Sequence, residues 1–382
     1  MTHKPVVAHI REVFFLPSET SLHTLISKQE KFKPLCLASA FKNLGQFPFA
    51  RRDCYRAAIC RNRLERHIGE LAGKYSAIPG LLRRLKVEML HAHFGPSGSF
   101  ILPYARENGI PLVTSFYGYD ASQLAGQKSW QRRYRELFNG GRLFLAEGEY
   151  LSRQLIRMGC PPDKIKIQRT GIPLERLPFR QRLPKKRGEK AIFIFCGRLV
   201  EKKGLLYALE AFRRLRETDT DFEFRIIGDG RLKNEVTAFI ARHKMQSCTR
   251  LLGTLDYERY ITEMDKADIC LAPSITASNG DNEGGAPTVI LEAQALGMPV
   301  VSTLHADIPN VCRRDISAVL CPERDAEKLA LSLKAILAGQ DAWKGMGEAG
   351  REFVSRYHDI NLTIGSLEQA YASLLAENDF KK

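Results

Sequence analysis

The chain has 382 residues and a formal net charge of +15, and its content of 44% hydrophobic and 26% charged residues is ordinary for a globular protein. This composition excludes a disordered chain and a coiled coil, and the length is that of about two domains. The charge is uneven, because residues 1–190 hold 34 Lys and Arg against 15 Asp and Glu, whereas residues 191–382 hold 24 against 28. This asymmetry indicates that the two halves bind different partners.

Short apolar runs bounded by turn residues alternate with amphipathic segments, the pattern of strands and crossover helices in a parallel sheet. Predicted strands of the first half are residues 6–11, 34–39, 89–94, 111–116, 143–146 and 165–168. Those of the second half are residues 191–196, 223–227, 250–252, 268–272, 299–303 and 318–321. The sequence therefore predicts an α/β protein with two doubly wound parallel-sheet domains, for which the default ligand site is the cleft between domains.

Residues 177–190 contain two prolines, no apolar period and a high density of Lys and Arg, which predicts an interdomain linker. We therefore expect one domain over residues 1–180 and a second over residues 181–357. The nine cysteines are scattered without metal-ligand spacing, which indicates a reduced, cytoplasmic compartment. Residues 1–11 lack the apolar run of a signal peptide, and no apolar run approaches the roughly 18 residues of a spanning helix.

The strand at 191–196 is followed by the motif G-R-L-V-E-K-K-G (residues 197–204) and a predicted helix over residues 205–216. Arg198 and Lys203 would leave the carboxyl end of a strand beside the positive N-terminal end of a helix. Two fixed cations in this position suit a pyrophosphate and could neutralise a leaving diphosphate, so we expect neither a metal ion nor another cofactor. The alternative is a solvated basic turn.

Residues 282–297, N-E-G-G-A-P-T-V-I-L-E-A-Q-A-L-G, predict a glycine-rich loop entering a helix, with Pro287 near its first position and Gly297 at its end. Backbone N–H groups of the loop are expected to face an anion. Glu292 lies early on an otherwise apolar helix, and a buried carboxylate there needs a partner such as a ribose diol. Glu283 could accept hydrogen bonds from sugar hydroxyls. The alternatives are an exposed helix charge and an ordinary loop carboxylate.

These two motifs, with I-G-D-G at 227–230, L-G at 252–253 and P-V-V-S-T at 299–303, resemble the nucleotide-sugar domain of retaining glycosyltransferases of family 4. The resemblance covers nearly the whole chain. It implies the GT-B fold, in which two Rossmann-like domains face each other across a cleft. It also implies that residues 358–382 form a helix that packs back on the first domain.

The resemblance implies that Arg198, Lys203 and Glu283 are the catalytic residues, that the first two hold the donor diphosphate, and that Glu292 holds the ribose. The remaining donor-binding positions that it implies are Gly228, Gly230, Gly253, Gly284, Gly285, Ala286, Pro287 and Thr288. The family separates its two glutamates by seven residues, whereas eight intervene here. This departure bears on the role of Glu283.

Three motifs of the first half follow predicted strands, and the resemblance places their polar residues on the acceptor or sugar side: Ser18, Glu19, Thr20, His93, Tyr117 and Asp120. A helix cap at Ser18 and a structural role for His93 are the alternatives. Many relatives have a His where this sequence has Tyr117, and that His touches the donor sugar. A phenol with an ordinary pKa of about 10 excludes an imidazole base there but can donate a hydrogen bond. Asp120 remains a candidate acceptor or base.

The implied function is that of a retaining hexosyltransferase. In front-face transfer, the leaving diphosphate would accept the proton of the attacking hydroxyl, and the enzyme would supply positioning and charge. The expected donor is a nucleotide-sugar, with UDP favoured over GDP. The expected acceptor is a glycan or a polyprenyl-diphosphate-linked glycan of cell-surface polysaccharide synthesis, such as exopolysaccharide or lipopolysaccharide. The alternatives are a sugar-nucleotide epimerase and a basic nucleic-acid-binding protein.

The chain offers no aromatic-rich basic motif for nucleic-acid recognition, and its second half is acidic, so we expect no nucleic-acid partner. Residues 54–71 instead predict an amphipathic helix rich in arginine, which suits an anionic membrane surface. A solvated helix packed on the domain core is the alternative. We therefore expect a cytoplasmic protein in peripheral contact with the inner face of the cell membrane.

Overall fold

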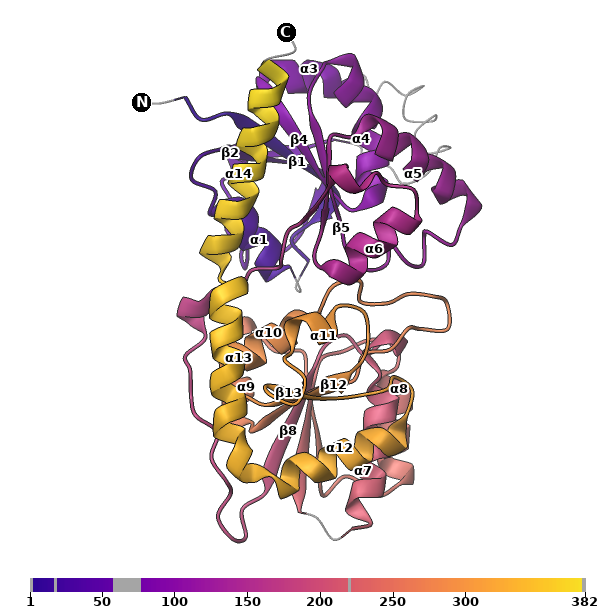
Figure 1. Cartoon of the computed structure of the whole chain (residues 1–382), viewed down its shortest axis with the longest axis vertical. Coiled ribbons are helices and arrows are strands. Elements are labelled where there is room, and N and C mark those ends of the chain that lie inside the picture. The colour runs from indigo at the N-terminus through magenta and orange to yellow at the C-terminus, as the bar shows by residue number, and fades with distance from the viewer. Residues whose placement is uncertain (1–2, 17–18, 58–76, 219–220, 380–382) are drawn as a thin grey trace. The chain divides into compact units, whose positions relative to one another are not determined.

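The computed structural model describes residues 3–16, 19–57, 77–218 and 221–379. The chain divides into two compact units (Figure 1). Unit 1 comprises Met1–Gly171 with Ile360–Lys382, and unit 2 comprises Ile172–Asp359. Each unit is built around one parallel sheet with helices on its faces.

The sheet of unit 1 has seven strands in the order β3-β2-β1-β4-β5-β6-β7. The strands are β1 (Val6–Phe14), β2 (Lys33–Phe41), β3 (Cys54–Arg56), β4 (Val87–His93), β5 (Leu112–Phe116), β6 (Leu143–Ala146) and β7 (Ile165–Ile167). The helices are α1 (Thr20–Ser27), α3 (Ala77–Arg84), α4 (Gly95–Glu107), α5 (Lys128–Gly140), α6 (Glu149–Arg157) and α14 (Ile360–Asp379). The six predicted strands are all present.

Strand β3 is an edge strand that the sequence did not predict, and it occupies the start of the segment predicted as an amphipathic membrane helix. It pairs in parallel with β2, from Cys36 opposite Cys54 to Ala38 opposite Arg56. Three residues are too few to show an alternating pattern, and this pairing is what makes the segment extended. The prediction is wrong for residues 54–56, and residues 58–71 lie outside the described part of the chain.

The sheet of unit 2 has six strands in the order β10-β9-β8-β11-β12-β13. The strands are β8 (Ala191–Cys196), β9 (Phe222–Ile227), β10 (Thr249–Gly253), β11 (Ile269–Ala272), β12 (Val300–Thr303) and β13 (Ala318–Cys321). The helices are α7 (Leu205–Arg216), α8 (Lys233–Arg242), α9 (Tyr257–Lys266), α10 (Thr288–Ala295), α11 (Ile308–Val311), α12 (Ala326–Ala338) and α13 (Trp343–Tyr357).

The predicted linker is not a linker, because residues 177–190 belong to unit 2. Arg182 is fully buried there, and its guanidinium donates to the carbonyls of Ala267 at 2.9 Å and Leu296 at 3.1 Å. These carbonyls stand at the C-terminal ends of α9 and α10, where helices leave acceptors without intrahelical partners. A basic segment that looked solvated in the sequence is therefore held by helix ends. The chain passes between the units at Gly171–Ile172 and returns at Asp359–Ile360.

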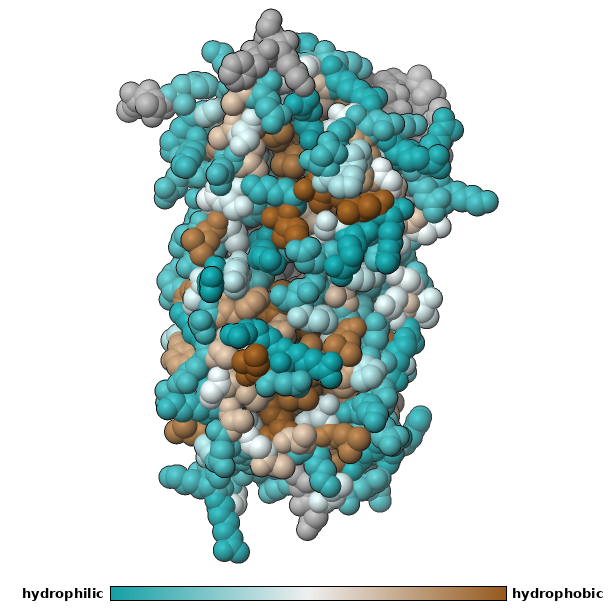
Figure 2. Space-filling view, viewed as in Figure 1, coloured by the Kyte–Doolittle hydropathy of each residue, from teal (hydrophilic) through white to brown (hydrophobic). Residues whose placement is uncertain are grey.

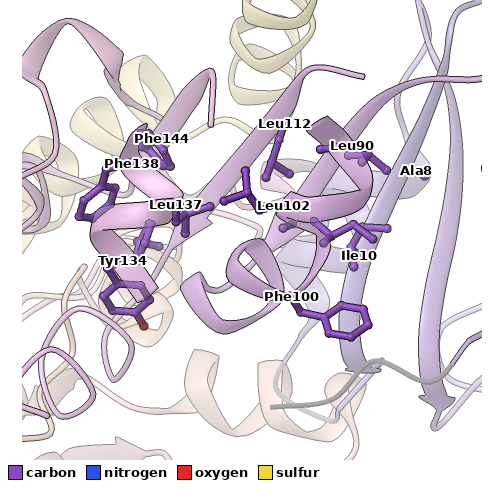
Figure 3. Packing of buried hydrophobic residues seen from close by; sticks show 14 of the residues in the cluster. Ala8, Ile10, Leu90, Phe100, Leu102, Leu112, Tyr134, Leu137, Phe138 and Phe144 are labelled. Carbon is purple, nitrogen blue, oxygen red and sulfur yellow. The ribbon is translucent and has the colours of Figure 1, made fainter. Parts of the chain in front are cut away.

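Buried side chains from helices and strands form the core of each unit. In unit 1, Figure 3 shows Phe100 and Leu102 of α4 and Leu137 of α5 beside strand residues of one cluster. On the other face of the sheet, Leu367 and Tyr371 of α14 pack against strand residues. On the visible face, hydrophobic residues are interspersed with hydrophilic ones (Figure 2).

In each sheet there is one place where the order in which the chain adds strands changes from one side to the other. In unit 1 the chain order changes direction between the neighbouring strands β1 and β4, and in unit 2 between β8 and β11. At such a point the connections on either side leave toward opposite faces, which opens a crevice at the carboxyl ends of the strands. We call these two places the unit 1 switch point and the unit 2 switch point.

Candidate active site

An ion pair lies at the unit 2 switch point. Lys203 ends the short 3-10 helix η4 (Glu201–Lys203) after β8, and Glu283 lies on the loop after β11. Lys203 Nζ is 3.0 Å from Glu283 Oε1, and the two side chains are only 16% and 9% exposed. The residues are 80 positions apart in the sequence and meet because β8 and β11 are neighbours.

A second lysine, which the sequence reasoning missed, anchors the same loop. Lys202 is buried, and its Nζ donates to Asp281 Oδ1 at 3.0 Å and to the carbonyl of Asn282 at 2.9 Å. Burial raises the pKa of Glu283, but the charges of Lys203 and Lys202 outweigh it and lower the pKa to about 2. Glu283 is therefore ionised at neutral pH and can only accept hydrogen bonds.

Glu283 is also held through its backbone. Its N–H donates to His305 Nε2 at 3.2 Å, so the ring proton of a neutral His305 lies on Nδ1, which is 3.2 Å from Glu323 Oε1. Ser274 Oγ donates to Glu283 Oε1 at 3.0 Å. Ser274 and His305 each follow a predicted strand at its carboxyl end, and this was the one sequence signal that could have found them.

Glu292 lies on α10 and has a tyrosine as its partner. The hydroxyl of Tyr260 donates to Glu292 Oε2 at 2.5 Å. Burial raises the pKa of Glu292 to about 7, although the bond from Tyr260 opposes the rise. This carboxyl therefore responds to pH near neutrality, in contrast to Glu283. The sequence predicted a partnered carboxylate here, and Tyr260 is the partner within the protein.

The glycine-rich loop differs from its prediction. The N–H of Gly284 donates to Asn282 Oδ1 at 2.9 Å, and the N–H of Gly285 donates to the carbonyl of Glu283 at 2.9 Å. These two groups are used inside the loop and are not aimed at an anion. The positive φ of 71° at Gly284 shows that glycine serves the turn there. Ala286 and Pro287 continue the loop, and Thr288 begins α10.

The other predicted glycines, Gly228, Gly230 and Gly253, lie at the carboxyl ends of β9 and β10. Gly228 has a φ of 132°, and a Cβ there would lie 2.0 Å from the carbonyl oxygen of Gly197. A Cβ on Gly230 would lie 2.6 Å from the carbonyl oxygen of Leu199. Gly253 also has a positive φ of 69°, but a Cβ there would meet open space. The loop after β8, including the exposed Arg198, therefore packs backbone to backbone on the loop after β9.

The two predicted acidic residues of unit 1, Glu19 and Asp120, accept hydrogen bonds from backbone N–H groups. Asp120 is fully buried, and its two oxygens accept the N–H groups of Tyr117 at 3.0 Å and Gly95 at 2.9 Å. Glu19 is buried, accepts the N–H groups of Phe15 and Leu16, and pairs with Arg11 at 2.5 Å. Thr20 begins α1, and Ser18 lies outside the described residues.

The unit 1 switch point holds a cluster of three buried histidines, His9, His91 and His93, of which the sequence singled out only the last. One nitrogen from each ring lies within 4.8 Å of the others, a spacing within which a metal ion could be held. All six ring nitrogens nevertheless have hydrogen-bond partners. Their partners are Gln29, Tyr371, Ser115 and Tyr117, together with the bond between His9 and His93. The cluster is thus a hydrogen-bonded network.

A surface hollow of about 490 Å³ is present in unit 1. It is lined by Leu44, Gly45, Pro48, Phe49, Ala50 and Arg51, and none of the predicted residues is part of this lining. Throughout the described part of the chain, no helix combines the length and the apolar character needed to cross a membrane.

Family models match both units. The model described as Glycosyl transferases group 1 matches residues 179–353, and that described as Glycosyltransferase Family 4 matches residues 35–176. The putative colanic acid biosynthesis glycosyltransferase WcaL of Escherichia coli is 33% identical over 337 residues, covering 87% of this chain and 77% of its own. The amylovoran biosynthesis glycosyltransferase AmsK of Erwinia amylovora is 34% identical over 283 residues, covering 72% of this chain and 69% of its own.

Solved structures show the same fold. The Anabaena protein Alr3699/HepE in complex with UDP superposes with a TM-score of 0.78 at 15% identity, covering 97% of this chain and 100% of its own. Sucrose-phosphate synthase of Thermosynechococcus elongatus gives 0.77 at 14% identity, covering 98% and 100%. With two parallel-sheet units and models that match both halves, the chain has the GT-B fold and belongs to the group 1 and family 4 glycosyltransferases.

Proposed function

We propose that the chain transfers a sugar from a UDP-sugar, with retention of anomeric configuration, to a growing exopolysaccharide unit. The observation that carries this proposal is the Lys203–Glu283 pair at the unit 2 switch point, with Glu292 on the next helix. Lys203 would bind the diphosphate, Glu283 would accept sugar hydroxyls, and Glu292 would hold the ribose. The likeness to WcaL and AmsK supports the pathway, and the UDP complex of HepE supports the nucleotide.

The proposed chemistry relies on charge. Negative charge would develop on the departing diphosphate beside Lys203, whose Nζ is held by Glu283. Arg198 would add an exposed cation on the same loop. An ionised Glu283 also keeps the Lys203 side chain in one position before the donor binds. The proton of the attacking hydroxyl would pass to the leaving diphosphate, so the step needs no further base and no metal ion.

Unit 1 would hold the acceptor. Arg51, Arg52, Arg56, Arg83, Arg84, Arg132 and Arg135 are all exposed, which suits a diphosphate-linked lipid or an anionic membrane surface. The hollow beside Phe49 and Arg51 combines apolar lining with one guanidinium, which suits the same type of acceptor. Binding of the full chain to phosphatidylglycerol vesicles, and not to phosphatidylcholine vesicles, would support peripheral membrane contact. Equal binding to both would contradict it.

Donor binding and stereochemistry can be tested without the acceptor. We expect UDP and one UDP-sugar, but not GDP, ADP or CMP, to raise the melting temperature of the chain. The same UDP-sugar should be slowly hydrolysed, and proton NMR should show that the released sugar first has the anomeric configuration of the donor. No thermal shift with any nucleotide would contradict the donor assignment, and release of the opposite anomer would contradict retention.

A further inference from the structure

The loop after β11, residues 273–287, is held near its start by two side chains that follow β13. Glu323 Oε2 accepts the N–H of Thr276 at 2.5 Å, and the guanidinium of Arg324 donates to the carbonyl of the same residue. Both backbone groups of Thr276 are therefore bound by consecutive side chains of a neighbouring loop. This fixes the backbone where the loop leaves the sheet.

The same carboxylate reaches Glu283 through the buried ring of His305. Glu323 Oε1 lies 3.2 Å from His305 Nδ1, and the N–H of Glu283 donates to His305 Nε2 at 3.2 Å. A backbone N–H can only donate, so His305 Nε2 must accept and the ring proton must lie on Nδ1. That proton is donated to Glu323, and one carboxylate thereby holds the loop at two separate places.

The chain between these two attachment points closes on itself and is held from the side of β8. The N–H of Ala277 donates to the carbonyl of Asp281 at 2.8 Å. Glu201, which begins η4 after β8, accepts the N–H of Ser278 at 2.8 Å and its hydroxyl at 2.7 Å. The loop is thus hydrogen-bonded to the rest of unit 2 along its length without any ligand.

The residues that follow His305 and Glu323 have an unfavourable backbone conformation. Ala306 has a φ of 46° and Arg324 a φ of 62°, both in the left-handed region that residues with a Cβ rarely adopt. Such conformations persist only where the surrounding structure determines them, and they cluster at functional sites. Each one here directly follows a side chain that holds the loop, so the backbone cost accompanies the placement of these two side chains.

The contacts of Glu283 come from neighbouring strand ends and not from the helix that follows it. Its carboxylate contacts Lys203 and Ser274, and its N–H binds His305. These three partners follow β8, β11 and β12, whereas Glu292 lies on α10. The position of the Glu283 carboxylate is therefore set across the sheet edge, whatever the spacing between the two glutamates in the sequence.

We propose that Glu323 and His305 are positioning residues that fix Glu283 in place for the donor sugar before the donor binds. That Glu283 receives a sugar rests on the proposed function, whereas the rigidity of the empty loop does not. A carboxylate that is already in place needs no reordering when the sugar arrives, so these two residues act on turnover through Glu283 and do not touch the substrate themselves.

The rigidity of the loop can be measured in the full chain by amide hydrogen exchange with mass spectrometry. We expect residues 275–285 to exchange slowly with and without UDP-glucose, and at least tenfold faster in Glu323→Gln. A glutamine can accept from Thr276 or from His305 but not from both, because its amide has one oxygen. Glu327→Gln, at an exposed position on α12, is the matched control and should exchange like the unmodified chain.

Two results of this experiment and its companion would overturn the proposal. The first is fast exchange in the empty chain that becomes slow only when UDP-glucose is added, or equal exchange in Glu323→Gln and Glu327→Gln. The second comes from long-range nitrogen–proton NMR of the chain labelled with ¹⁵N-histidine, with His305→Gln to assign the signal. We expect His305 to be protonated on Nδ1 at pH 7.5, and protonation on Nε2 would contradict its bond from Glu283.

Hydrolysis of UDP-glucose tests the consequence for turnover. Glu323→Gln and His305→Asn should each lower kcat about tenfold, the size of one hydrogen bond. Affinity for UDP, which carries no sugar, should change less than twofold. His305→Gln should recover most of the rate, because its amide oxygen can replace Nε2 as the acceptor for the N–H of Glu283.

The outcomes separate a positioning role from a structural one, and both from the proposed function. Equal losses of kcat and of UDP affinity in Glu323→Gln, or equal rates in His305→Asn and His305→Gln, would overturn the positioning role. Failure of the unmodified chain to bind or hydrolyse UDP-glucose would instead count against the proposed function. The exchange and tautomer measurements would still decide whether the loop is held in place in advance.

Discussion

The two switch points have the same topology and opposite chemistry. The unit 2 switch point holds charged groups, with Lys203 against Glu283 and Lys202 beside them. At the unit 1 switch point three neutral histidines form hydrogen bonds without an ion pair among themselves. The parallel sheet decides where a ligand can bind, and the residues decide which ligand. A charged crevice suits a diphosphate, and a neutral crevice lined by hydrogen-bonding side chains suits a carbohydrate.

The largest effect is expected where the charged site loses its central cation. Lys203→Met should lower the rate of donor hydrolysis by about 100- to 1000-fold, as removal of one preorganised charge-stabilising group does in other enzymes. Lys334→Met, an exposed lysine on α12, is the matched control and should leave the rate unchanged. A rate within a few-fold of the unmodified chain in Lys203→Met would show that the ion pair is only structural.

A single added methyl group should disrupt the close packing of backbone on backbone at the unit 2 switch point. Gly228→Ala places a Cβ against the carbonyl oxygen of Gly197, so we expect a loss of several kcal/mol in the free energy of unfolding. Gly253→Ala has open space and a φ of 69°, in the left-handed helical region that an L residue can adopt, so it should cost only about 1 kcal/mol. Urea denaturation compares the two. Equal costs would contradict the expected clash of a Cβ at position 228 with the carbonyl oxygen of Gly197.

The two glutamates of the charged site should respond differently to pH. The pKa of Glu292 is raised in the folded state, so its contribution to stability is present in acid and is lost as the pH rises through about 7. Glu292→Gln should therefore raise the free energy of unfolding at pH 8 by roughly 1–3 kcal/mol, and by much less at pH 5. It should also weaken UDP binding roughly tenfold at pH 8.

Urea denaturation at both pH values measures the expected gain in the free energy of unfolding of Glu292→Gln. Titration of UDP measures the expected loss of affinity. A variant that is less stable than the unmodified chain at pH 8 would contradict the raised pKa. Unchanged UDP affinity would show that Glu292 does not hold the ribose.

The smallest effect is expected at Arg198. Its side chain is exposed and forms no salt bridge with any residue in the described part of unit 2, whereas Lys203 is paired with Glu283. Arg198→Met should raise the KM for the UDP-sugar by less than tenfold and change kcat little. A loss as large as that of Lys203→Met would show that the loop closes on the donor and makes Arg198 an equal partner.

The fold was largely predictable because its signals are local. Apolar runs located the six predicted strands of each unit, and motif spacing located Lys203, Glu283 and Glu292. Features that depend on distant partners were not predictable: Arg182 looked solvated because nothing nearby in the sequence shows that α9 and α10 end beside it. The cluster of three histidines likewise depends on distant partners, because His9 and His93 are 84 residues apart and become neighbours only through the pairing of β1 with β4.

Calorimetric titration of UDP into the unmodified chain and into Lys203→Met at pH 8 tests most directly that the charged switch point is the nucleotide-diphosphate site. We predict that UDP binds the unmodified chain, that affinity falls at least tenfold in Lys203→Met, and that uridine binds both chains weakly and equally. Equal UDP affinity in the two chains, or no binding to either, would contradict the account.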